Sequence, residues 1–195
     1  DEFRDVVISL EELLSVLTRV GENEGLWKWA VISSHAALQG AALCILSGTD
    51  GLGALCKKRE ERLREFYLAG QREGFTETDA LQVQADARTA SFPELLRRLP
   101  PGLRVSLPHR CAEGWGFELE GDFRRLHEMR SEFLHFKVVS WSIEISGLPR
   151  IVSRAVKMTK NIIDDERYNR VNRFRDTDAS VLCDHVLQVL RSLEE

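Results

Sequence analysis

The chain has 195 residues, of which 43% are hydrophobic and 30% are charged. This composition is typical of one soluble globular domain with a substantial core, and we expect a single domain over residues 1–195. The net charge of -4 excludes a histone-like or tail-driven nucleic-acid binder, because no overall basic field would attract a polyanion. Any contact with nucleic acid must therefore come from a local basic patch.

The cysteines and the first residues indicate the compartment. Cys44, Cys56, Cys111 and Cys183 lie far apart without paired spacing, which excludes a zinc knuckle and a secreted disulfide framework. The charged stretch 1–5 lacks the basic start and apolar run of a signal peptide. We expect a cytoplasmic protein that carries no metal and no other cofactor.

The first predicted helix follows a capping box. Ser9 and Glu12 have the spacing of reciprocal caps, and Gly21 is the predicted end of the helix. Residues 6–8 either extend this helix backwards or form an apolar staple. The apolar face behind the capping box consists of Leu10, Leu13, Leu14 and Leu17.

The second predicted helix, at about residues 26–46, is apolar on nearly all sides and should be the central buried element. Its length is that of a membrane span, but Lys28, His35 and Gln39 interrupt the apolar run, so we expect no membrane insertion. His35 and Gln39 lie one turn apart. They form either a buried polar pair satisfied by neighbours or a support for a site on a facing helix.

Three weaker signals follow. The glycine-rich stretch 48–53 lacks a preceding strand and a Lys-Ser/Thr pair, so it predicts a connector and not a phosphate loop. Mixed charges predict a solvated helix at about 57–68. Ser91, Pro93 and Glu94 predict a short helix that ends near residue 99, before a long loop to residue 121.

The most informative stretch lies at residues 126–136. Apolar residues recur at spacings of three and four and predict one buried helix face, formed by Phe123, Leu126, Met129, Phe133 and Phe136. His127, Ser131 and His135 form a polar row on the same helix, with Arg130 at its border. Since a guanidinium can hold phosphate oxygens and an imidazole can move protons, the pattern favours phosphodiester chemistry.

Arg130, Ser131 and His135 match the R-polar-x3-H motif, and the chain resembles HEPN domains. The stretches 30–39 and 141–151 are similar to one branch of bacterial HEPN-like proteins, in which the polar position is often asparagine. The resemblance implies an all-α HEPN-like bundle. We expect six or seven helices and one short extended piece at 141–146. It also implies a metal-independent endoribonuclease of a defence or toxin type, with RNA as substrate and an antitoxin or effector as a candidate further partner.

In the mechanism implied by the resemblance, His135 is the acid or base, Arg130 holds the phosphoryl oxygens and Ser131 orients one of them. Arg130 and His135 lie about 140° apart around a regular helix, so we expect a homodimer in which both chains contribute to one cleft. Two alternatives remain open: a non-catalytic domain that binds RNA, nucleotide or a protein, and a structural Arg130 paired with Glu128 or Glu132.

The C-terminal third adds basic side chains. Pro149 predicts the start of a helix with a buried face and a basic outer row of Arg150, Arg154 and Lys157. Arg170 and Arg173 lie in the stretch 167–175, which is either an RNA contact or a solvated loop. A last helix is predicted at about 178–193. The candidate substrate-binding residues are His127, Arg150, Arg154, Lys157, Arg170 and Arg173.

Overall fold

The computed structural model describes residues 2–48, 52–73, 88–107, 119–134, 145–168 and 179–193, without the side chains of residues 62, 67 and 69–73. Over these ranges the protein has seven α-helices, one 3-10 helix and no strand, which confirms the predicted all-α class. The elements are α1 (Glu2–Leu17), η1 (Glu24–Leu26), α2 (Trp27–Ser47), α3 (Lys57–Glu73), α5 (Phe92–Arg98), α6 (Leu119–Leu134), α7 (Leu148–Ile163) and α9 (Ala179–Ser192).

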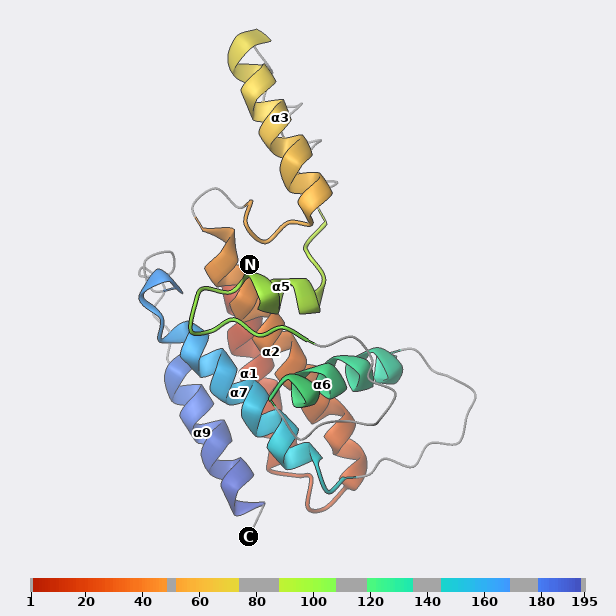
Figure 1. Cartoon of the computed structure of the whole chain (residues 1–195). Helices are drawn as coiled ribbons and strands as arrows, with labels where there is room; N and C mark the ends of the chain where they lie inside the picture. The colour runs from red at the N-terminus through yellow and green to blue at the C-terminus, as the bar shows by residue number, and fades with distance from the viewer. Residues whose placement is uncertain are drawn as a thin grey trace.

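Four helices form the body of the protein. α1 packs on α2 and α9, and α7 packs on the same two helices, so the four enclose one hydrophobic core (Figure 1). α6 lies against α2 and α7, and the short α5 lies against α2. α2 therefore contacts α1, α5, α6 and α7, which makes it the central element, as its apolar sequence predicts.

The burial of α2 follows from its composition. Small and aliphatic residues face its neighbours on several sides, and a Cβ added at Gly40 would lie 2.8 Å from Cγ2 of Val6, which shows how closely α1 approaches. The segment Glu24–Ser47 is long and apolar enough to cross a membrane, and 67% of its most apolar window is buried in the protein. Core helices and membrane spans share these properties, so the absence of membrane insertion stays a prediction.

α1 begins earlier than the Ser9 capping box indicates. The helix begins at Glu2, seven residues before the Ser9 capping box, and it ends at Leu17, before Gly21. Phe3 and Val6 continue the apolar row of the later leucines and are buried, and their burial holds the two additional turns in the core. Residues 6–8 thus extend the helix, which is one of the two alternatives given by the sequence.

α3 runs to Glu73, beyond its predicted end, and projects from the helical body (Figure 1). Its base is tied to the segment before α5 by an isolated antiparallel bridge between Leu55 and Thr89. Gly53 lies in the predicted connector, where a Cβ would meet the carbonyl oxygen of Leu46 at 2.1 Å. Only glycine fits this close approach of two backbone segments.

α5 has the predicted N-cap residue but not the predicted capping bonds. Ser91 occupies the N-cap position and Pro93 lies in the first turn, yet the serine side chain makes no capping hydrogen bond. Glu94 accepts hydrogen bonds from Arg97 and Arg98. Arg98 also donates to the backbone carbonyl of Leu55 at 2.6 Å, so this arginine joins α5 to the base of α3.

The last two helices agree with the sequence. α7 begins at Leu148 with Pro149 in its first turn, and α9 covers the predicted range within one residue at each end. The predicted inner face of α7 is buried throughout: Ile151, Val152, Ala155, Val156, Thr159, Ile162 and Ile163. The predicted extended piece falls mainly on residues 141–144, outside the described residues.

Candidate functional site

α6 carries the motif residues. Its apolar face lies in the core as predicted, with Phe123, Leu126, Met129 and Phe133 buried. Arg130 and Ser131 are described and partly buried, whereas His135 lies outside the described residues. The structure therefore places two of the three predicted catalytic residues.

His127 forms a polar contact with the central helix. Its Nδ1 lies 3.0 Å from Nε2 of His35 on α2, so one imidazole donates the proton that the other accepts. Phe92 of α5 packs against both rings, with ring centroids 4.2 Å from His35 and 5.2 Å from His127. His35 is thus satisfied by a neighbour, which agrees with the first of the two alternatives predicted for it. The second alternative, support of a site at His135, stays a prediction, because His135 lies outside the described residues.

The environment keeps both imidazoles neutral. Burial, followed by the nearby His127 and Arg130, lowers the pKa of His35 to about 3. Burial, Arg130 and Arg124 also lower the pKa of His127. Protonation of either ring would place a second cation near the Arg130 guanidinium. The pair is therefore a neutral hydrogen bond at pH 7.

Arg130 lines an open pocket of about 260 Å³ between α1, α2 and α6. The pocket is bounded by Glu2, Asp5, Ile32, His35, Ala36, Gln39, Gly40, Leu43, Arg130 and Leu134. Within the described part of the chain, Arg130 has no ion pair: Glu128 pairs with Arg124 at 3.7 Å. The predicted structural pairing of Arg130 with Glu128 is therefore absent among these residues.

Ser131 bonds to its own helix. Its hydroxyl donates to the backbone carbonyl of His127 at 3.0 Å. This bond occupies the single proton of the hydroxyl, and the oxygen keeps acceptor capacity. In this geometry Ser131 would have to exchange the helix bond for a bond to substrate before it could donate to a phosphoryl oxygen.

A buried carboxylate on α6 binds two of the predicted substrate-binding arginines. Arg150 donates to both oxygens of Asp122, each at 3.1 Å, and Arg154 donates to Oδ2. The Asp122 side chain is only 3% exposed, whereas those of Arg150 and Arg154 are 39% and 29% exposed. These arginines thus join α7 to α6 and still present part of their surface to solvent. The role of both arginines in substrate binding stays a prediction.

The sequence analysis missed Asp122. Its signal was available, because Asp122 precedes Leu126 and Met129 by four and seven residues and so shares their buried face. An acidic residue at such a position needs a cationic partner. Of the other predicted contacts, Lys157 is exposed on α7, and Arg170 and Arg173 lie outside the described residues.

The described residues form an all-α protein with a polar cluster on α6, the helix that packs against the central α2. Comparison with known proteins finds no matching family model, no matching curated protein and no matching solved structure. The function is therefore argued from the residues of this chain.

Proposed function

We propose that the protein is a HEPN-like, metal-independent endoribonuclease. The supporting observation is the position of Arg130: it lines an open pocket on the motif helix, and no described carboxylate forms an ion pair with it. A guanidinium in this state can bind a phosphodiester bidentately. His135 follows it at the motif spacing.

The proposed reaction is a transesterification within RNA. The ribose 2′-hydroxyl loses its proton to a general base and attacks the adjacent phosphorus, while the bond to the 5′-oxygen breaks and this oxygen receives a proton. His135 serves as acid or base, and Arg130 stabilises the charge that develops on the phosphoryl oxygens. The products are a 2′,3′-cyclic phosphate and a free 5′-hydroxyl.

The basic surface of α7 supports RNA binding. Arg150 and Arg154 together carry two positive charges against the single charge of Asp122, and the exposed Lys157 follows on the same helix. Such a surface binds the phosphate backbone without reading sequence. Arg170 and Arg173 follow α7 in the chain, and we propose that they also contact the RNA backbone.

We propose further that two chains form the active site together. Around a regular helix, residues at the spacing of Arg130 and His135 point in directions about 140° apart, so one helix does not easily aim both at one phosphate. A two-fold axis beside α6 brings His135 of one chain near Arg130 of the other.

The test is cleavage of mixed RNA by the purified protein in the presence of a chelator. We expect cleavage with cyclic or 3′-phosphate ends, and loss of cleavage in folded Arg130→Ala and His135→Ala variants. Mixed together, the two variants should regain activity, because a heterodimer keeps one intact pair. Arg191→Ala and His185→Ala remove an exposed arginine and an exposed histidine from α9 and should cleave like the parent.

Ends with a 5′-phosphate, or cleavage that needs an added divalent ion, would contradict the proposed mechanism. Mixed variants that remain inactive would contradict the shared site and leave cleavage within one chain.

A non-catalytic RNA-binding domain is the second candidate. It is favoured by the helix bond of Ser131 and by Glu2 and Asp5, which line the same pocket as Arg130 and weaken its attraction for an anion. In this case the protein binds RNA without cutting it, and His135→Ala leaves the affinity unchanged. Filter binding and the cleavage assay on the same preparations separate the two functions.

A further inference from the structure

The proposed cleavage needs two groups that transfer protons, and the motif supplies one of them. A base must take the proton of the ribose 2′-hydroxyl, and an acid must give a proton to the departing 5′-oxygen. His135 serves as one of the two. A second imidazole, that of His127, lies on α6 in the same polar row and precedes Arg130 by three residues.

The ring of His127 is held at one nitrogen and open at the other. Its Nδ1 lies 3.0 Å from Nε2 of His35, and Phe92 stacks against the ring with an interplanar angle of 18°. Among the described residues, Nε2 of His127 has no hydrogen-bond partner, and the residue is only partly buried. An imidazole that is oriented through one nitrogen and open at the other has the arrangement of a general base with its supporting partner.

The surrounding charges favour the tautomer that a base requires. The described groups that act on this ring are His35 of α2 and Arg124 and Arg130 of α6, and α5 presents the uncharged Phe92. Both arginines carry donors only, so they favour a proton on Nδ1, where it is donated to His35, and a lone pair at Nε2. Burial, Arg130 and Arg124 lower the pKa of His127, so the ring is unprotonated at pH 7.

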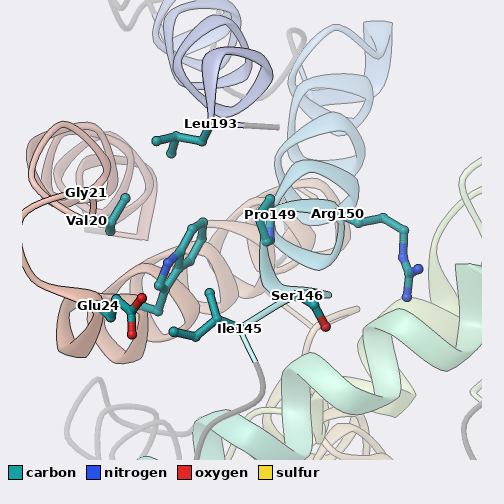
Figure 2. Close-up of a pocket in the computed structure, with 9 residues that line it drawn as sticks. Val20, Gly21, Glu24, Ile145, Ser146, Pro149, Arg150 and Leu193 are labelled. Carbon is teal, nitrogen blue, oxygen red and sulfur yellow. The ribbon is translucent and has the colours of Figure 1, made fainter. Parts of the chain in front are cut away.

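Contacts on two sides of α6 fix the position of His127. Arg150 lines a separate pocket of about 460 Å³ at the start of α7, and Figure 2 shows its side chain extending from this pocket towards α6. There its guanidinium binds Asp122. On the side of α2, His35 binds His127. A helix anchored to two neighbours keeps a catalytic group in place before the substrate binds.

The spacing along α6 decides which chain supplies each group. His127 and Arg130 are about 4.5 Å apart along the axis of a regular helix and point within about 60° of each other. His127 and His135 are about 12 Å apart along the same axis. The attacking and the leaving oxygen bind one phosphorus on opposite sides. One helix therefore supplies His127 with Arg130, and the facing helix of the second chain supplies His135.

We propose that His127 is the general base of the cleavage, an inference that rests on the proposed function. Nε2 of His127 takes the proton of the 2′-hydroxyl while the 2′-oxygen forms its bond to phosphorus. The bond between phosphorus and the 5′-oxygen breaks, and His135 of the second chain gives this oxygen its proton. Arg130 of the first chain holds the phosphoryl oxygens. Exchange of protons with solvent then restores both rings.

The first experiment measures RNA cleavage by the full chain as a function of pH. His127→Gln should lower kcat by about 100-fold or more, the usual contribution of a general base. In the parent, kcat/KM should rise with pH through a pKa below the ordinary value of 6.5, because the base acts only when it is unprotonated. The rise should be absent in His127→Gln. The control His185→Gln changes an exposed histidine of α9 and should keep both the rate and the rise.

Chemical rescue and chain mixing separate catalysis from a structural role. Added imidazole should restore cleavage by His127→Ala and not by Arg130→Ala, because it replaces only the lost base. Mixed with His135→Ala, the His127→Gln chain should regain activity, since one site of the heterodimer then holds all three groups. Mixed with Arg130→Ala, it should stay inactive, because each site then lacks one group.

Parent-like kcat in His127→Gln, or a reduced kcat that keeps the rise with pH, would overturn the proposal and leave the ribonuclease intact. If the variants do not fold, modification of the parent by diethyl pyrocarbonate decides. We expect a 2′-O-methyl RNA, which lacks the nucleophile, to protect His127, and unhindered modification would overturn the proposal. A parent that cuts no RNA would refute the proposed function and this inference together.

Discussion

Two of the polar contacts that attach α6 to the rest of the bundle differ in charge. On one side, His127 and His35 form a neutral hydrogen bond between α6 and α2, packed against Phe92 of α5. On the other side, Asp122 forms a charged cluster with Arg150 and Arg154 of α7. Both contacts bury polar atoms at the edge of an apolar helix face.

The difference determines how each contact fails. The histidine pair needs no counter-charge, but a proton added to it creates a buried cation near Arg130. The Asp122 cluster depends on one buried carboxylate, and removal of this carboxylate takes a negative charge away from two arginines at once. The first contact is therefore sensitive to pH and the second to substitution.

The largest expected effect is the loss of the buried charge. Asp122→Asn should lower the free energy of unfolding by about 3 kcal/mol, because both arginines lose the negative charge of Asp122 in a partly buried place. Urea denaturation at pH 7 measures this change. The control Asp184→Asn affects an exposed carboxylate 3.1 Å from Lys160 and should cost less than about 0.5 kcal/mol. An equal loss of unfolding free energy in the two variants would mean that burial of Asp122 adds nothing to stability.

The histidine pair predicts a dependence on pH. The native pKa of His35 is about 3, below its ordinary value of 6.5, so the unfolded chain binds more protons and stability falls as the pH drops below 6.5. Between pH 7 and pH 5 this loss should reach about 2 kcal/mol. His35→Gln should remove that part of the slope, and the exposed His185→Gln should keep it. Parallel slopes for wild type and His35→Gln would contradict the buried neutral pair.

The smallest expected effect on stability concerns Ser131. Among the described residues, its hydroxyl bonds to the preceding turn of its own helix, so Ser131→Ala should change the free energy of unfolding by less than about 0.5 kcal/mol. If Ser131 orients a phosphoryl oxygen, as the resemblance to HEPN domains implies, the same variant should lose about ten-fold in kcat. An unchanged kcat would limit the role of Ser131 to the helix.

The apolar patterns predicted the helical class and the buried faces of α6 and α7. Regular spacing was sufficient for this, because residues three and four apart share a helix face in any tertiary context. The Ser9 capping box left the start of α1 open, because it is a local signal and burial of Phe3 and Val6 outweighs it.

The candidate site was predictable only within one helix. By itself the sequence determined that Arg130, Ser131 and His127 lie on α6, because their spacing decides this. It did not determine that His127 meets His35, 92 residues away, or that Asp122 binds the arginines of α7. These partners depend on how α2, α6 and α7 pack, and the pKa of His35 depends on the burial that this packing creates. Helix periodicity says nothing about which helices pack together or how deeply His35 is buried. Only the tertiary structure therefore decided the contact partners and the pKa of His35.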